Sequence, residues 1–175
     1  MIKRFVLLGL MFVTLGSVAQ KIDDLETVRS QFQVIDSEED IQKIILFQID
    51  NLNSSVGQMI RAYKAAATCM MANYVFSPKS KLRYFNQGKK ELEEIITIDK
   101  EVENVYLRLL LQLNVPKMLN YNDDIEEDVA YLDAYLGSSD IDVVYKNTMI
   151  QNLLSVAKKK ELKETLLQIE VVKEE

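Results

Sequence analysis

Residues 54–75 read SSVGQMIRAYKAAATCMMANYV, and this stretch decides the fold class. Its inward positions recur every three or four residues, the spacing of one face of a helix: Met59, Ala62, Tyr63, Ala66, Met70, Asn73 and Tyr74. Alanines at 62, 65, 66 and 72 leave one side without bulk, so a neighbouring helix can approach closely there. We therefore predict a long helix over 54–75, stopped by Ser77-Pro78, that packs closely against another helix.

The rest of the chain carries the same helical pattern. Five glycines and two prolines in 175 residues are too few turn formers for a many-stranded β protein. Apolar spacing predicts further helices over 24–32, 37–49, 79–97, 104–113, 125–136 and 141–169. Ser37 is the expected N-cap of its helix, and 137–140 should end one helix and cap the next. The lysines at 158–160 either divide the last helix or mark its solvent face.

The first residues have the layout of a secretory signal. Lys3 and Arg4 precede an apolar run over 5–15, and small residues at 17–19 offer a cleavage site. The run is too short for a membrane span, which needs about 20 apolar residues. We predict a signal peptide over 1–19 and a single helical domain over 20–175, located in a bacterial periplasm or secreted; a short uncleaved anchor is the alternative.

Composition limits the partners and the sources of stability. The formal net charge of −6 opposes generic nucleic-acid binding, so no nucleic acid is expected as a partner. A membrane surface stays possible as a partner, whereas an integral membrane position after signal cleavage does not. Cys69 is the single cysteine, so no internal disulfide can form and a lipid anchor at the cleavage point is not implied. We expect Cys69 to be a buried small hydrophobe rather than a reactive thiol.

The residue types of common active sites are missing. Histidine is absent from the sequence, which removes the commonest general base and transition-metal ligand, and one cysteine cannot build a zinc or iron–sulfur site. The acidic run at 122–128 lacks the glycine of a calcium loop and suits the first turn of a helix. Ser155 and Lys158 match a Ser-x-x-Lys pattern without its companion motifs. We predict no enzyme, no metal and no cofactor, and keep a carboxylate-dependent hydrolase as the third hypothesis.

Charge is segregated along the chain. No acidic residue occurs between Asn51 and Lys90, whereas acids outnumber bases from Glu91 to Asp140. The basic stretch 61–90 predicts an anion-binding surface for acidic lipid, glycan or an acidic partner. Its candidate residues are Arg61, Lys64, Lys79, Lys81, Arg83 and Lys89. The alternative is that the basic and acidic segments exchange salt bridges, or that the basic residues form a solvated face.

Residues 92–99, LEEIITID, and the positions Tyr106, Leu109 and Leu113 after them form a longer-range pattern. The first segment is similar to the end of the second helix of the tetratricopeptide repeat, and the three positions fall where the next repeat of that family places its packing residues. The resemblance covers 62–113, about one and a half repeats. Lys100 stands at the proline position of the family and Phe76 at its small glycine. The resemblance implies stacked antiparallel helix pairs that bind protein, and it transfers no functional residue.

These observations lead to one leading hypothesis about fold and function. We predict an all-α protein of antiparallel helix pairs, tetratricopeptide-like or another α-solenoid, with a compact helical bundle as the alternative. Its expected role is that of an exported, noncatalytic helical-repeat protein that contacts another protein. The second hypothesis is an anion-binding module centred on 61–90.

Overall fold

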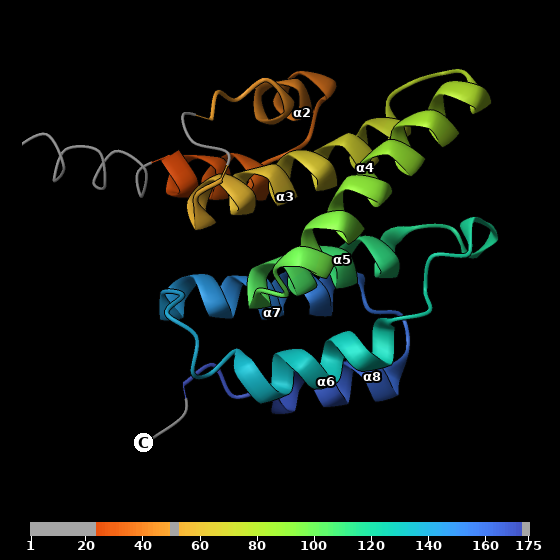
Figure 1. The fold of residues 1–175 in the computed structure, drawn as a ribbon. Helices are drawn as coiled ribbons and strands as arrows, with labels where there is room; N and C mark the ends of the chain where they lie inside the picture. Colours follow the sequence, from red (N-terminus) through yellow and green to blue (C-terminus); the bar gives the residue numbers. More distant parts are fainter. Residues whose placement is uncertain (1–23, 50–52, 173–175) are drawn as a thin grey trace, which may run out of the picture. The chain divides into compact units, whose positions relative to one another are not determined.

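The computed structural model describes residues 24–49 and 53–172, and every regular element within them is helical. This confirms the predicted all-α class. The predicted signal peptide over 1–19 lies outside the described residues. Residues 24–33 form the first described helical segment, and the helices that follow (Figure 1) are α2 Glu38–Ile45, α3 Ser55–Met70, α4 Pro78–Ile98, α5 Val102–Asn114, α6 Ile125–Tyr135, α7 Val143–Val156 and α8 Lys160–Gln168. Two short 3-10 turns lie at Met71–Asn73 and Lys117–Leu119.

Backbone contacts divide the chain into two compact units, Met1–Phe85 and Asn86–Glu175, and each is described by itself. Helix α4 crosses the boundary between them. The prediction of a single helical domain over 20–175 stays a prediction.

In the first unit, α2 packs against α3. Ser37 caps α2 as predicted, because its side chain accepts a hydrogen bond from the Asp40 backbone N–H at 3.2 Å. The rings of Phe32 and Tyr63 meet edge to face with centroids 5.1 Å apart, which joins the first helical segment to α3. Further core residues of this unit are Val28, Ile41, Ile44 and Ile60.

Helix α3 confirms three of the four predicted alanines and ends earlier than predicted. Ala62, Ala65 and Ala66 are fully buried, and Cys69 is buried as expected. Ala72 lies beyond the end of α3 and is half-buried, and Asn73 and Tyr74, which were predicted to face inward, are exposed. The helix stops at Met70 and a 3-10 turn continues only to Asn73, so Pro78 does not stop this helix. Pro78 instead opens α4, where its missing N–H leaves no helical bond unmade.

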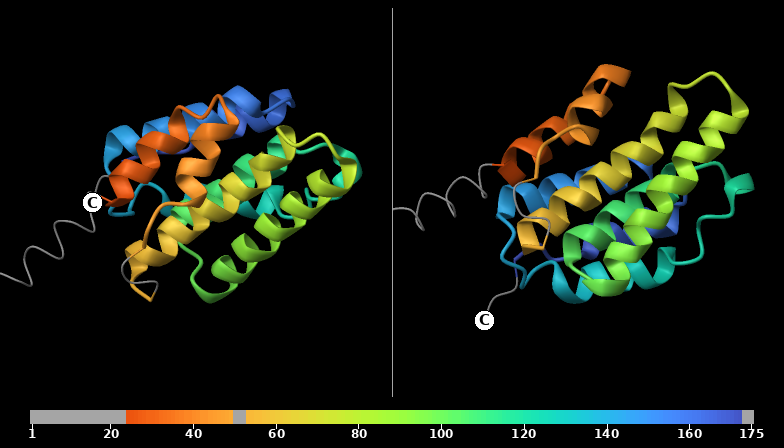
Figure 2. Two further views of the ribbon diagram at one scale, coloured as in Figure 1. Left: turned by 90° about the horizontal axis from the view of Figure 1, so that it is seen from above. Right: turned by 45° about the horizontal axis from the view of Figure 1, so that its top comes forward.

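The second unit contains residues 86–98 of α4 and two helical hairpins laid side by side (Figures 1 and 2). Helix α5 packs against α6 and α7 against α8, and between the hairpins α5 contacts α7 while α6 contacts α8. The largest fully buried side chains of this unit are Leu92, Ile95, Tyr106, Leu107, Leu109, Leu132, Leu136, Met149 and Leu153. The core of this unit therefore contains side chains of both hairpins together with Leu92 and Ile95 of α4.

Two helix ends in this unit refine the sequence-based boundaries. The lysines at 158–160 do divide the last predicted helix, since α7 ends at Val156 and α8 begins at Lys160. The N-cap of α7 is Asp142, whose side chain accepts from the N–H groups of Val144 and Tyr145, and not a residue of 137–140. Asp142 is favoured as the N-cap because its carboxylate accepts hydrogen bonds from two backbone N–H groups that would otherwise be unpaired.

Candidate functional site

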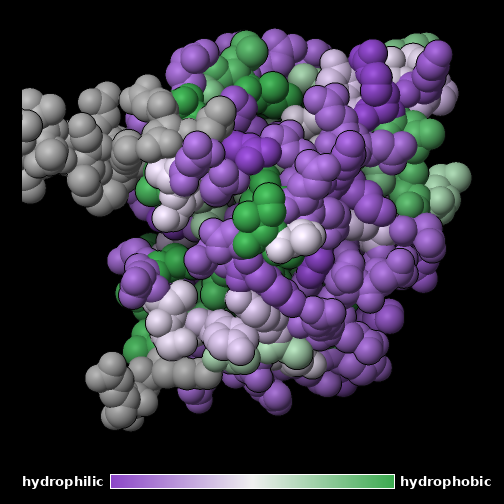
Figure 3. Space-filling view, viewed as in Figure 1, coloured by the Kyte–Doolittle hydropathy of each residue, from purple (hydrophilic) through white to green (hydrophobic). Residues whose placement is uncertain are grey.

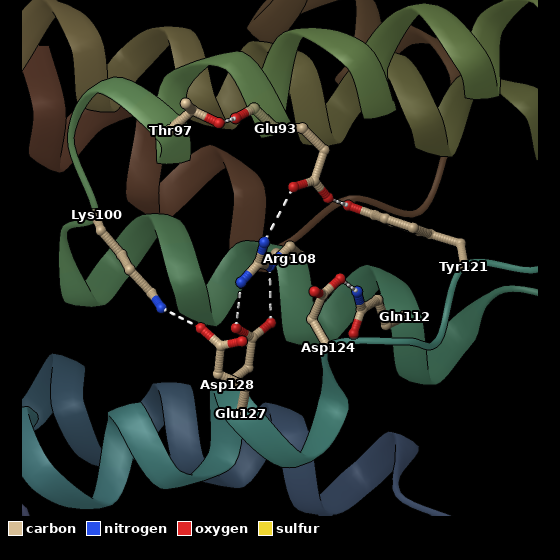
Figure 4. Close-up of polar contacts among 9 residues, drawn as sticks. All are labelled: Glu93, Thr97, Lys100, Arg108, Gln112, Tyr121, Asp124, Glu127 and Asp128. Carbon is tan, nitrogen blue, oxygen red and sulfur yellow. Dashed lines mark hydrogen bonds and ion pairs between the residues drawn. The ribbon is translucent and has the colours of Figure 1, made fainter.

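Arg108 is the centre of a polar network inside the second unit (Figure 4). It lies on α5 with 6% of its surface exposed. Its Nε donates to Asp128 Oδ2 at 2.9 Å and its Nη2 to Asp128 Oδ1 at 2.5 Å. Its Nη1 donates to Glu93 Oε2 at 3.0 Å, so one guanidinium joins α4, α5 and α6.

Other polar groups extend this network toward the α5–α6 connection. The Tyr121 hydroxyl donates to Glu93 Oε1 at 2.6 Å, and Gln112 Nε2 donates to Asp124 Oδ2 at 3.0 Å. At the opposite side, Lys100 Nζ pairs with Glu127 Oε1 at 2.5 Å. The acids that open α6 therefore bind α5 and the connection between α4 and α5, and they also complement the helix dipole.

Burial and ion pairing have opposite effects on the pKa values of Arg108 and Asp128. Burial disfavours the charge of Arg108, but the hydrogen bonds and attraction of Asp128 and Glu93 outweigh it and raise the pKa of Arg108. Burial also raises the pKa of Asp128, against the hydrogen bonds from Arg108 that lower it. Since a guanidinium keeps its proton at physiological pH, the two-point contact describes a charged pair at neutral pH.

A cavity of about 520 Å³ opens beside Gln112, at the end of the first hairpin. Its apolar walls come from Leu113, Val115, Pro116, Ile125 and Leu162, and its polar lining residues are Gln112, Lys117, Asn120, Tyr121, Asn122, Lys158 and Lys159. None of the described residues that line it is acidic. The cavity thus combines an apolar surface with three lysines.

The connection between α5 and α6 shapes this cavity. Pro116 precedes the turn Lys117–Leu119, and Asn120 follows in the left-handed conformation at φ 47° and ψ 54°. Asparagine tolerates this region better than most residues, and it redirects the chain toward Tyr121. Tyr121 is then buried, and the ammonium of Lys89 lies 4.4 Å from the centroid of its ring.

Gln112, which lines this cavity, has one buried side-chain atom without a hydrogen-bond partner. The residue is 3% exposed and its Nε2 is bonded to Asp124, whereas its Oε1 is buried and accepts no hydrogen bond. A buried acceptor without a donor is costly, and native proteins leave few of them. This oxygen is therefore a candidate contact for an N–H or O–H donor of a ligand.

A second cavity, of about 780 Å³, adjoins the first. Asn122, Ile125, Lys159 and Leu162 line both. The second also has four carboxylates in its lining, from Asp123, Glu126, Asp133 and Glu161. Two cavities of opposite electrostatic character thus meet along α6 and α8.

The residues predicted to bind anions are distributed over both units. Arg61 donates to Gln58 Oε1 at 2.9 Å and Lys64 to the Phe47 carbonyl at 2.9 Å, so both engage neighbours on their own unit. Lys79, Lys81 and Arg83 are exposed on the first turns of α4. Lys89 belongs to the second unit, beside Tyr121. Sequence reasoning missed Lys117, Lys158 and Lys159, for which the 158–160 run was the available signal.

Several large apolar side chains are exposed, and on the face drawn in Figure 3 hydrophobic patches are separated by hydrophilic surface. The most exposed are Phe76 at 99%, Met118 at 88% and Ile98 at 79%. Met118 lies on the same α5–α6 connection that lines the first cavity. This connection therefore offers an apolar contact next to the lysines.

Within 24–49 and 53–172, no group of three or more Asp, Glu or Cys side chains is placed to hold a metal ion. No helix in the same residues has the length and apolarity to cross a membrane. Comparison with protein-family models, curated proteins and solved structures finds no match to this chain.

Proposed function

We propose that this chain is an exported, noncatalytic helical-repeat protein that acts by binding another protein. The observation that carries the proposal is the first cavity, which joins an apolar lining to three lysines and the buried acceptor Gln112 Oε1. Exposed Met118 lies on the same connection. Mixed apolar and charged surface of this kind suits contact with a polypeptide.

The packing order of the second unit supports a repeat. Each helix contacts its hairpin partner and the helix two positions along the chain, as stacked helix pairs do. The tetratricopeptide resemblance expects a first helix over 104–113, and α5 occupies that position and pairs with α6. The helices of one hairpin then correspond to those of the next.

The polar network supports a structural rather than a catalytic use of the carboxylates. Asp128 accepts twice from Arg108, and Glu93 accepts from both Arg108 and Tyr121. Each oxygen of these two carboxylates already accepts a hydrogen bond from the protein, which suits a role in holding the helices together. The sequence also contains no histidine that could take that role.

Site-specific photo-crosslinking in the source cells tests the protein contact. A benzoylphenylalanine at Asn120, which is exposed and lines the first cavity, should form one reproducible adduct with another protein. The matched control is the same group at Gln151, which is exposed on α7 and lines neither cavity. Its adduct with that protein should be weak or missing.

Specific binding requires two further results. Excess unlabelled chain should compete away the Asn120 adduct, and Lys158→Glu together with Lys159→Glu should reduce it. Equal adducts at Asn120 and Gln151 would indicate nonspecific capture and contradict the proposed function. An adduct that persists in the presence of excess unlabelled chain would do the same.

Export is tested by the mass of the mature protein. A secretory signal cleaved after Ala19 leaves a chain that starts at Gln20. Mass spectrometry of the protein recovered from the periplasm or medium should find that species. A chain that keeps its first residues and stays in the cytosol would contradict export, but it would not contradict the proposed binding of another protein.

The second candidate function is anion binding by the basic stretch 61–90, and one observation favours it. Lys79, Lys81 and Arg83 are exposed within two turns at the start of α4. Charge reversal at Arg61, Lys64, Lys81 and Arg83 should abolish sedimentation with vesicles that contain phosphatidylglycerol. Unchanged sedimentation would exclude this function, and vesicles of phosphatidylcholine provide the neutral control.

A further inference from the structure

We propose that the two adjoining cavities form one binding groove for an extended peptide segment that carries an acidic side chain, an apolar side chain and a basic side chain, in that order along the groove. This inference rests on the proposed function, because it names the chemistry of the protein partner. The groove is defined by the lining residues of the two cavities, which share Ile125 and Leu162 as a common apolar wall.

The basic half of the groove is suited to the acidic side chain of the partner. Lys117, Lys158 and Lys159 line the first cavity, and none of them makes an ion pair with any residue in the described part of the chain. The neighbouring Lys160 differs, because it pairs with Glu164 at 3.4 Å. Three ammonium groups without a carboxylate partner make this half complementary to an anion.

The buried acceptor points to a backbone N–H in the partner. Gln112 Nε2 is engaged by Asp124, which fixes the amide so that Oε1 is the atom left without a donor. An extended peptide presents an N–H every second residue on each side, so it can supply the missing bond beside an apolar side chain. A carboxylate without an N–H would leave this oxygen unsatisfied.

The acidic half of the groove selects against a simple amphiphilic anion. Asp123, Glu126, Asp133 and Glu161 line the second cavity, and no described lysine or arginine forms a salt bridge with any of the four. The tail of a fatty acid has no positive charge to place there, and a nucleic acid would be repelled. A peptide with a basic side chain after its apolar residue matches both halves.

Fluorescence anisotropy with short synthetic peptides tests the inference on the full mature chain. The ordered probes hold two aspartates, two leucines and two lysines in that sequence, and the same residues in the reverse chain direction. The comparison probes have the same composition with alternating charges, an all-acidic version, an all-basic version, and labelled laurate. At least one ordered probe should bind about tenfold more tightly than every comparison probe, and salt should weaken it.

Matched variants assign the binding to the groove. Lys158→Glu with Lys159→Glu should weaken the ordered probe about tenfold or more and shift preference toward the all-basic peptide. Glu126→Lys with Asp133→Lys should shift preference toward the all-acidic peptide. Lys163→Glu and Glu170→Lys change exposed residues that line neither cavity, and they should leave both affinities unchanged.

Gln112→Leu tests the acceptor separately from the charges. This change keeps the size of the side chain similar and removes Oε1 together with the Nε2–H group that donates to Asp124, so it should weaken the ordered peptide and leave its charge-order preference intact. The circular dichroism spectrum and the urea midpoint of each variant show whether it is folded. If Gln112→Leu does not fold, an ordered probe with one leucine N-methylated at its backbone nitrogen removes the donor instead and should lose the same affinity.

Three results would overturn the inference: equal binding of ordered and alternating peptides, binding of laurate alone, or equal loss from Lys163→Glu and the Lys158/Lys159 pair. The proposed function fails differently. A specific adduct at Asn120 with no order-dependent peptide binding would leave the protein contact standing and remove the peptide groove. Order-dependent binding without a cellular adduct would uphold the groove chemistry and remove the cellular role.

Discussion

Arg108 on α5 holds Asp128 on α6 through two hydrogen bonds, Nε to Oδ2 at 2.9 Å and Nη2 to Oδ1 at 2.5 Å. The side chain of Asp128 is fully buried and that of Arg108 is 8% exposed. Both charged groups therefore lose their contact with water on folding and gain the contact with each other instead. Such a pair adds little net stability over well-packed apolar residues, whereas the removal of only one partner is costly.

Arg108→Met should destabilise the second unit strongly, because it leaves Asp128 buried without its partner. We expect a loss of about 3–5 kcal/mol in the free energy of unfolding, measured by urea denaturation. Arg108→Met combined with Asp128→Leu should recover much of that loss, since both charges are then gone. The double-mutant cycle gives the coupling energy between the two positions.

Lys100→Met is the matched control for this prediction. Lys100 also pairs with an acid of the first turn of α6, but its side chain is 36% exposed and that of Glu127 is 65% exposed. Water already solvates both groups, so the expected loss is about 0–1 kcal/mol. Similar losses for Arg108→Met and Lys100→Met would show that the burial of Arg108 has no energetic consequence.

The pKa of Asp40 should lie at about 2, below its ordinary value of 3.8, because the Ser37 hydroxyl donates to its carboxylate and Lys43 assists. A lowered pKa means that the folded state binds this proton more weakly than the unfolded state. Its contribution to stability is thus present above pH 3.8 and is lost as the pH falls toward 2. Carbon-13 NMR of the Asp40 carboxyl group follows the titration directly.

Ser37→Ala should raise the Asp40 pKa toward 3.8, since it removes the largest of the lowering causes. The same change removes the N-cap of α2 and should cost about 0.5–2 kcal/mol. Lys43→Met removes the second cause and leaves the cap, so it separates the two effects. A parent titration midpoint near 3.8 would refute the hydrogen bond from Ser37 to the carboxylate.

Local sequence signals predicted most of the helices well. The Ser37 cap, the alanines of α3 and the apolar spacing from Ile125 to Leu136 each depend on neighbours within a few residues, and the structure confirms them. The end of α3 was predicted too late because Pro78 dominates the pattern, whereas a 3-10 turn already closes the helix at Met71–Asn73. Helix ends depend on such local competition more than helix centres do.

The candidate site could not be predicted in the same way, because its residues come from distant parts of the chain. Gln112 and Lys159 share one cavity although they lie on opposite sides of α6 and α7 in the sequence. The run at 158–160 was visible as positive charge, but nothing local shows that it faces the α5–α6 connection. Asp128 was correctly placed in the first turn of a helix, while its pairing with Arg108 depends on the packing of α5 against α6.

Lys146→Met should lower the free energy of unfolding, because Lys146 holds the connection between α6 and α7. Lys146 is 5% exposed, and its Nζ donates to the carbonyls of Gly137 at 3.0 Å and Ser139 at 2.7 Å. Methionine keeps the length of the side chain and leaves both carbonyls without this donor, so we expect a loss of about 1–3 kcal/mol by urea denaturation. Lys163→Met, at an exposed position of α8, should change stability by about 0.5 kcal/mol or less. Equal effects of the two changes would show that the hydrogen bonds of Lys146 to Gly137 and Ser139 do not stabilise the protein.

Ala66→Leu should show how closely α3 is packed. Ala66 is fully buried on a helix whose Ala62 and Ala65 are buried as well, so the backbone lies near its neighbours and leaves no room for a larger side chain. Overpacking should cost about 1–3 kcal/mol in the free energy of unfolding, although leucine is a good helix former. Ala134→Leu makes the same change at an exposed position of α6 and should stay within about 0.5 kcal/mol of the parent. If the Ala66→Leu variant were as stable as the parent, the alanines would fill a loose interface, and the close approach inferred from residues 54–75 would be wrong.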